Sequence, residues 1–171
     1  VGLLWAVGVA AHAAPQPVAV RVEAGQSIQQ AIDAAAPGAV IEIARAYYRE
    51  NLRIDRPLTL RGVDRPTISG GLTGDTIRVA SSGVVIEGLI VRDSGDSLIR
   101  QNAGIYIQPG AHGAVVRRCD LVYNLFGLWI EKADDVVIEG NLITGKRDLS
   151  STQRGNGIQL YNTRRARIVD N

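Results

Sequence analysis

The chain has 171 residues, with 19 Lys and Arg against 17 Asp and Glu, which gives a formal net charge of +2. A charge this close to zero gives no reason to expect nucleic acid or an acidic membrane as the main partner. Apolar residues make up 46% of the chain and charged residues 21%, so we expect one folded domain rather than a disordered chain. Aromatic residues are scarce and glycine is abundant, a profile typical of strands and turns.

Residues 1–14 are apolar, carry no Lys, Arg, Asp or Glu, and end in Ala11-His12-Ala13, a small-x-small pattern that signal peptidase reads. We interpret them as a partial export signal that lacks its basic start, since the chain contains no Met. A buried N-terminal strand or helix is the alternative. The apolar run is shorter than the roughly 20 residues of a membrane-spanning helix, so we expect no membrane span here. Export predicts a periplasmic location.

Residues 15–38 predict a strand at Val18–Glu23 and a short amphipathic helix at Ser27–Gly38. Ser27 and Gln30 have the spacing of a capping box, in which each side chain accepts or donates a hydrogen bond at the helix start. The helix is expected to end at Pro37-Gly38 and to cover an open hydrophobic end of the domain. Its apolar face is formed by Ile28, Ile32 and Ala36.

Residues 39–171 contain a repeat, which is the most informative feature of the sequence. Four similar segments begin 30, 22 and 30 residues apart, at Val84, Ala114, Val136 and Ala166. A second apolar strand follows the first three of them, beginning at Gly104, Gly127 and Gly157. The basic unit is therefore about 22 residues, and two units carry an insertion of eight residues at the same corner. Earlier units are indicated by alternating segments that begin at Ile41, Leu52, Leu58 and Ile77.

A unit of about 22 residues with two or three short strands is too short for helical crossovers between parallel strands. It predicts an all-β parallel β-helix, in which each rung of strands pairs with the next rung about 4.8 Å away. The helix before it is then a cap. The chain stops inside a strand, so the solenoid is expected to be truncated at its C-terminus, with an edge prone to association.

The repeat also places residues in columns. Asn141 and Asn171 share one inward column and are expected to form an amide ladder, with Cys119 as a small buried thiol in the same column. As the single cysteine, Cys119 excludes an intrachain disulfide. Two outward sets alternate in charge and predict weak ion pairs between rungs. They are Glu87, Arg117 and Glu139, and the pairs Asp134-Asp135 and Arg164-Arg165.

A third outward column contains Arg78, Tyr106, Trp129 and Gln159. Exposed aromatic residues in a row can stack on sugar rings or anchor a protein partner, and Arg78 beside Tyr106 allows a cation–π contact. Two alternatives stay open: aromatic residues favour strand surfaces in general, or these lie under an inserted loop. The second insertion, Thr144–Asn156, is basic and predicts an acidic partner through Lys146, Arg147 and Arg154. The first, Arg92–Ala103, holds Asp93 and Asp96, a solvated turn or a hard-cation site.

Several segments together resemble the NosD family. They are SIQQAIDAAAPG, the Tyr47-Tyr48-Arg49-Glu50-Asn51 step, PLTLRG, VVIEGLIVRDSG and RGNGIQLYNT. The resemblance covers roughly residues 18–171. It implies a periplasmic right-handed parallel β-helix that helps to assemble the copper sites of nitrous oxide reductase. The implied partners are the subunits of an ABC transporter, a copper chaperone and the reductase itself.

The residues present offer little for copper, which as Cu(I) prefers thiolate, thioether or imidazole ligands. After removal of the signal they include Cys119, His112 and no Met, so we assign no metal ligand, and copper is expected only in the full-length protein. No catalytic residue is assigned either. Two alternatives to a non-catalytic accessory protein stay open: a polysaccharide lyase, hydrolase, esterase or epimerase, and a structural exported solenoid.

Overall fold

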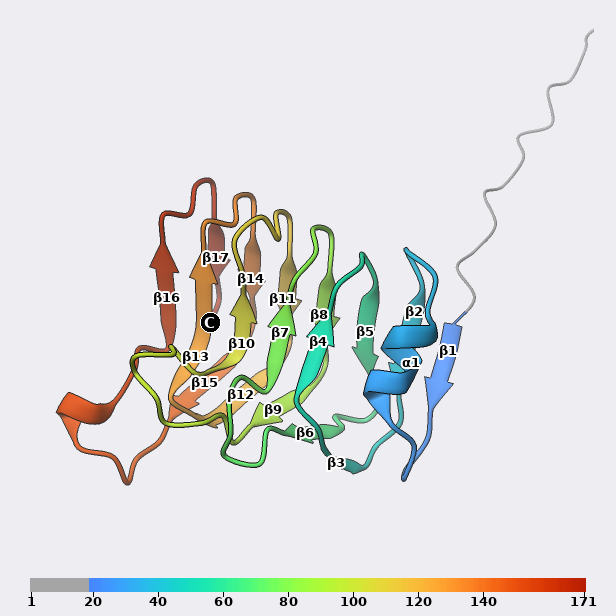
Figure 1. Ribbon diagram of the computed structural model, residues 1–171, viewed down its shortest axis with the longest axis horizontal. Coiled ribbons are helices and arrows are strands. Elements are labelled where there is room, and N and C mark those ends of the chain that lie inside the picture. Colours follow the sequence, from blue (N-terminus) through green and yellow to red (C-terminus); the bar gives the residue numbers. More distant parts are fainter. Residues whose placement is uncertain (1–18) are drawn as a thin grey trace, which may run out of the picture.

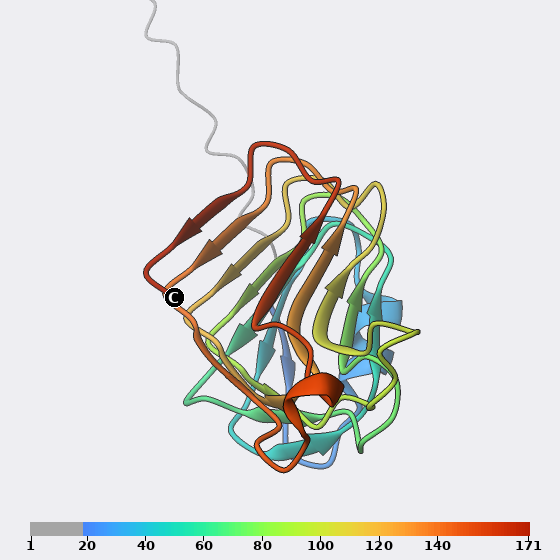
Figure 2. The ribbon, with the colours of Figure 1, turned by 90° about the vertical axis from the view of Figure 1, so that its left-hand side faces the viewer.

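The computed structural model describes residues 19–171. The export signal expected at residues 1–14 lies outside this range. Short strands stack side by side along the length of the molecule, and each turn of the chain passes through three walls (Figure 1). All strand pairs are parallel. In an end-on view the three walls enclose a common interior (Figure 2).

The first wall has seven strands and the other two have five each. The first contains, in order, β1 (Ala19–Val22), β2 (Val40–Ile43), β5 (Thr59–Gly62), β8 (Val85–Glu87), β11 (Val115–Arg117), β14 (Val137–Glu139) and β17 (Arg167–Val169). The second contains β3 (Tyr47–Arg49), β6 (Thr67–Ser69), β9 (Ile90–Arg92), β12 (Asp120–Asn124) and β15 (Leu142–Gly145). The third contains β4 (Leu52–Ile54), β7 (Ile77–Val79), β10 (Ala103–Ile107), β13 (Phe126–Glu131) and β16 (Ile158–Tyr161).

The strand register confirms the spacing expected from the repeat. Val115 of β11 lies beside Val85 on one side and Val137 on the other, and Val137 lies beside Arg167, which reproduces offsets of 30, 22 and 30 residues. Both long connections fall between the second and third walls, where residues 93–102 and 146–157 project as loops. The second loop contains a one-turn 3₁₀ helix, η1 (Ser151–Gln153).

The interior is filled by one aliphatic side chain after another along the stack. Ile41, Leu60, Ile86, Val116 and Ile138 occupy successive strands of the first wall and are each buried. Successive side chains along each strand point to opposite faces, so one set enters the core and the other faces outward. This architecture is a parallel β-helix, as the repeat predicted.

The helix α1 (Ile28–Ala34) closes the N-terminal end of the stack beside β4, and buries Ile28 and Ile32 in the core (Figure 1). The third predicted apolar position is wrong: Ala35 is buried and Ala36 is exposed, because the helix ends at Ala34. The helix also protects the edge of β4. The side chain of Gln29 accepts from Arg53 N at 2.8 Å and donates to Arg53 O, as a neighbouring strand would.

The helix start is capped in part as expected. The hydroxyl of Ser27 accepts a hydrogen bond from Gln30 N at 3.2 Å. The side chain of Gln30 makes no reciprocal bond to Ser27 N, and the other side-chain contacts at the helix start come from Glu50. The Glu50 carboxylate accepts from Ile28 N at 3.0 Å and Gln29 N at 3.1 Å, as well as from the Ser27 hydroxyl. Glu50 therefore satisfies two amides that have no partner inside the helix.

We expect Glu50→Ala to lower the free energy of unfolding by about 1–2 kcal/mol, because it removes the cap from these amides. The matched control is Glu23→Ala, since Glu23 is exposed and forms a single exposed ion pair with Arg21. Urea unfolding followed by circular dichroism compares the two variants. An equal, small effect of both substitutions would contradict the capping role.

The amide ladder of the inward column is confirmed. Asn141 Nδ2 donates to Asn171 Oδ1 at 2.7 Å and to Val116 O at 3.1 Å, while Asn141 Oδ1 accepts from Cys119 N. Cys119 is fully buried, and this burial raises the pKa of its thiol to about 11, although backbone hydrogen bonds from the Gly88-Leu89 segment act in the opposite direction.

Because only the thiolate attacks disulfide reagents, native Cys119 is expected to be nearly inert. Modification by DTNB at pH 8 should proceed at least 100-fold more slowly in the folded protein than in denaturant. Rapid, stoichiometric modification under native conditions would show that the core opens around β11 and β12.

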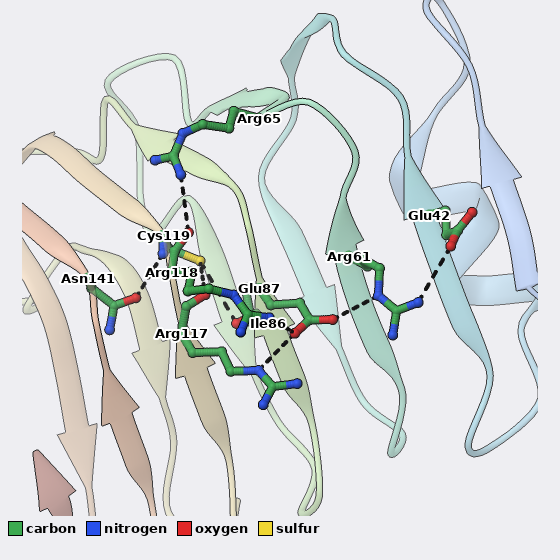
Figure 3. A network of polar contacts seen from close by, with 9 residues as sticks. All are labelled: Glu42, Arg61, Arg65, Ile86, Glu87, Arg117, Arg118, Cys119 and Asn141. Atoms are coloured by element: carbon green, nitrogen blue, oxygen red, sulfur yellow. Dashed lines mark hydrogen bonds and ion pairs between the residues drawn. The ribbon is translucent and has the colours of Figure 1, made fainter. Parts of the chain in front are cut away.

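The outward charges of the first wall form a longer column than the sequence indicated. Going along the wall, Arg21, Glu42, Arg61, Glu87, Arg117 and Glu139 are neighbours in register and alternate in sign. At its centre, Glu87 accepts from Arg61, Arg117 and Arg118, each at 2.8 Å (Figure 3). Hydrogen bonds from Arg61 and Arg117 outweigh the effect of burial and lower the pKa of Glu87.

The second predicted charge set is also present. Arg165 pairs with Asp135 at 2.6 Å and with Asp134 at 3.5 Å. His112 lies on the same corner and accepts a hydrogen bond from Asp134 N through Nδ1. These contacts give the acidic pair and His112 a structural role in holding successive turns together.

Candidate docking site

The outer face of the third wall contains the column of candidate binding residues. Arg53, Arg78, Tyr106, Trp129 and Gln159 lie on neighbouring strands in register, from β4 to β16. The Arg78 guanidinium lies 4.3 Å from the centre of the Tyr106 ring, which confirms the expected cation–π contact. The rings of Tyr106 and Trp129 are stacked with centres 6.5 Å apart.

The expectation of an exposed aromatic row is wrong at Tyr106, which is only 6% exposed. Arg78 covers one side of the Tyr106 ring, and the Tyr106 hydroxyl donates to Glu131 at 2.5 Å. Burial, together with this hydrogen bond to a carboxylate, raises the pKa of Tyr106 to about 12. Tyr106 therefore supports the site from below rather than offering a surface for stacking.

Trp129 is half-buried and belongs to a small second core outside the main one. Phe126 meets it edge-on at 5.0 Å between ring centres, and Leu149 from the second inserted loop packs against the same cluster. The open alternative, in which the aromatic residues lie under an inserted loop, is the one the structure supports. Within the described residues, the Trp129 indole Nε1 is buried and has no hydrogen-bond partner.

The three basic residues of the second loop do not form one exposed patch. Lys146 is 2% exposed, and its ammonium donates to Ser94 O at 2.6 Å and to the Asp96 carboxylate of the first loop. Its predicted contact with an acidic partner is therefore wrong, because the charge joins the two inserted loops. Arg154 donates to Leu149 O and Arg147 O within its own loop. Arg147 remains exposed.

A hollow of about 750 Å³ lies beside the first inserted loop and over β7 and β10. Its lining is polar and includes two guanidinium groups, from Arg78 and Arg100. The remaining lining residues are Gly74, Asp75, Ser97, Gln101, Asn102 and Tyr106. A second hollow of about 460 Å³ adjoins it through Gly74, Asp75 and Arg78, and extends to Arg53.

Asp75 holds the floor of the larger hollow. Its carboxylate accepts from Arg78 Nε at 2.9 Å and from Ala103 N at 3.0 Å, while Asn51 Nδ2 donates to its carbonyl oxygen. Burial raises the pKa of Asp75, although the contacts with Ala103 and Arg78 oppose the shift. Through these contacts the Asp75 carboxylate fixes the Arg78 side chain and the start of β10.

The described residues bring no group of three or more His, Cys, Asp or Glu side chains together as a metal site. Asp96 is paired with Lys146, while Asp93 accepts from the Ser69 hydroxyl at 2.7 Å. Both carboxylates therefore have partners within the protein, and the Asp93 side chain, at 13% exposed, is less solvated than the expected solvated turn would leave it. Cys119 is inside the core and His112 is at a corner, so their positions do not fit a shared copper site.

The sequence did not single out Asp75, Arg100 or the exposed Ile99. Asp75 and Arg100 lie in loops outside the repeat, so an alignment of the rungs does not predict where these residues lie. One signal was available for Ile99: Leu98-Ile99 is an apolar pair inside an otherwise polar insertion. Within residues 19–171, no helix is long and apolar enough to cross a membrane.

The stack of parallel rungs defines the protein as a parallel β-helix. Its inserted loops lie at one corner, with a polar hollow beside them. Residues 62–171 match the family model described as "Right handed beta helix region", and the chain belongs to that family. The chain is a NosD-like member of it. It is 35% identical over 129 residues to the probable ABC transporter binding protein NosD of Pseudomonas aeruginosa, which covers 75% of this chain and 30% of that protein.

A second NosD, from Stutzerimonas stutzeri, is 27% identical over 124 residues, covering 72% of this chain and 28% of the relative. The chain thus spans less than a third of the length of these curated relatives. Among solved structures, a pectin methylesterase in complex with a hexasaccharide superposes with a TM-score of 0.58 at 18% identity, covering 91% of this chain and 67% of the other. At this identity the likeness concerns the fold alone.

Proposed function

We propose that this chain is part of a non-catalytic, exported accessory protein that works with an ABC transporter in the periplasm. The observation that carries the proposal is the 35% identity to a protein named as a probable ABC transporter binding protein NosD. The finer role that we propose is assistance in delivering copper to nitrous oxide reductase, with the transporter, a copper chaperone and the reductase as protein partners.

Within this role, the β-helix supplies a rigid surface for protein contacts. Its rungs are cross-linked by the backbone ladders, by the Asn141–Asn171 amides and by the charge column around Glu87. Such a surface keeps interface side chains in place before a partner arrives, which lowers the entropic cost of binding. Copper is the cargo in this proposal, and the described residues do not fit a resident copper site, so no step is assigned to metal ligands here.

Complementation tests the role directly. The full-length gene is placed in a denitrifying bacterium that lacks its own NosD, and the copper content of purified nitrous oxide reductase is measured. We expect copper to be restored to near the level of the parent strain. A copper-poor reductase, in the presence of exported and folded protein, would overturn the maturation role.

A carbohydrate-active enzyme is the competing function, because the same fold occurs in a pectin methylesterase. Acid–base catalysis on a sugar polymer needs a carboxylate that can reach the reacting bond. In the hollow, the Asp75 carboxylate is buried and bound by Arg78 and Ala103. We expect no release of uronate or methanol from pectin or other uronate polymers, and turnover abolished by Asp75→Asn would establish the enzyme instead.

A further inference from the structure

The tip of the first inserted loop is an exposed apolar feature on a fixed support. Ile99 is 90% exposed and Leu98 is also exposed, both beside the larger hollow. Burial of an isoleucine side chain is favourable, and Ile99 contributes almost none of this stabilisation to the folded chain. We call residues 98–100 the loop tip.

The loop tip is held by a closed set of hydrogen bonds. Asn102 N donates to Ser97 O and Gln101 N donates to Leu98 O, each at 3.2 Å. The Asn102 side chain, which is buried, accepts from Ser97 N at 3.1 Å, and the Ser97 hydroxyl accepts from Arg100 N. The next residue, Ala103, is fixed by Asp75. Ile99 is therefore presented by an ordered turn, so that its burial by a partner costs little loop entropy.

The loop tip carries one positive charge, that of Arg100. Arg100 follows Ile99 and lines the hollow, and no ion pair involves it in the part of the chain that the structure describes. Arg78 lies in the same hollow with its charge matched by Asp75, and Arg53 extends the basic surface into the adjoining hollow. A carboxylate entering beside Arg100 would gain a charge-assisted hydrogen bond without displacing an existing partner.

We propose that the loop tip and the hollow beside it form a docking surface for a protein partner that presents an acidic side chain next to an apolar pocket. Ile99 enters the pocket and Arg100 binds the carboxylate. This inference rests on the proposed function, which supplies the transporter as the partner to test. An aliphatic anchor favours a protein over a sugar, because the aromatic residue that would stack on a sugar ring, Tyr106, is covered by Arg78.

The test uses the full-length protein and the purified membrane subunits of its ABC transporter, reconstituted in nanodiscs. Binding is measured by biolayer interferometry for the wild type and for Ile99→Ser and Arg100→Glu. Each substitution should raise Kd at least 10-fold, as expected for an interface anchor. Ile99→Leu keeps an apolar anchor, and Arg45→Glu makes the same charge change at an exposed position before β3, so both should bind within about 3-fold of wild type.

The outcomes separate this inference from the proposed function. Full binding by both Ile99→Ser and Arg100→Glu would overturn the docking surface while leaving the accessory role intact. Equal binding of the wild type to empty nanodiscs would assign the surface to lipid and overturn the inference as well. Failure of the wild type to bind the transporter, combined with a copper-poor reductase in the complementation assay, would overturn both the docking surface and the proposed function. Circular dichroism of each variant verifies folding, which these exposed positions should not affect.

Discussion

Gly127→Ala is expected to lower the free energy of unfolding by roughly 3 kcal/mol, because an added methyl group has no space between two rungs. A Cβ at this position would lie 2.4 Å from Gly157 O and 2.5 Å from Ile143 Cγ2. Gly157 O is the acceptor for Leu128 N at 2.9 Å, so moving it away weakens the ladder between β13 and β16. Gly104, one rung earlier, is similarly confined, since an added Cβ would lie 2.6 Å from Asn124 Nδ2, whereas at Gly157 it would meet only Ile143 Cγ2, at 3.5 Å. Close packing therefore requires glycine at Gly104 and Gly127.

Gly145→Ala is the matched control for this prediction. Gly145 ends β15, one wall away, and a Cβ there would meet only Asn124 O, at 3.9 Å. Its backbone does not have the positive φ that favours glycine. We expect a change within about 0.5 kcal/mol. Thermal unfolding of both variants checks the prediction, and similar melting temperatures would show that the rungs separate easily enough to admit a methyl group.

Glu87→Gln is expected to cost roughly 2 kcal/mol, because three arginines donate to this carboxylate and an amide offers one neutral oxygen in its place. The side chain of Glu87 is 6% exposed, so water does not compensate for the loss. Glu139→Gln is the control within the same column. Glu139 is half-exposed and, among residues 19–171, pairs with Arg167 alone, so its substitution should cost less than about 1 kcal/mol.

The stabilisation of the folded protein by Glu87 should decrease as the pH falls. Its pKa in the folded protein lies below the ordinary value of 4.5, because the hydrogen bonds from Arg61 and Arg117 outweigh the cost of burial. The stabilisation is therefore complete above about pH 4.5 and is lost as the pH falls through the lower, folded pKa. Urea titrations of wild type and Glu87→Gln should differ most at neutral pH and converge in acid. A difference that grows in acid would contradict this assignment.

The sequence by itself determined the repeat and what depends on it. Parallel rungs place equivalent residues in register, so the spacing of Val84, Ala114 and Val136 was enough to predict the strand neighbours. The Asn141–Asn171 ladder, the buried Cys119 and the Glu87–Arg117 contact follow from the same periodicity. Local periodicity carries this information because each side chain on a rung contacts its equivalents one rung away.

Only the tertiary structure decided the positions of residues outside the repeat. Glu50 caps α1 across 22 residues of sequence, and Lys146 crosses 50 residues to reach Asp96. The contact with Asp96 explains one wrong prediction, since Lys146 is enclosed between the two inserted loops. Tyr106 lies within the repeat and its contact with Arg78 was expected, but periodicity did not specify that its ring would be buried. An inserted loop has no equivalent in the next rung, so its side chains meet partners that periodicity does not specify. The exposed loop tip, where the docking surface is proposed, is one of these positions.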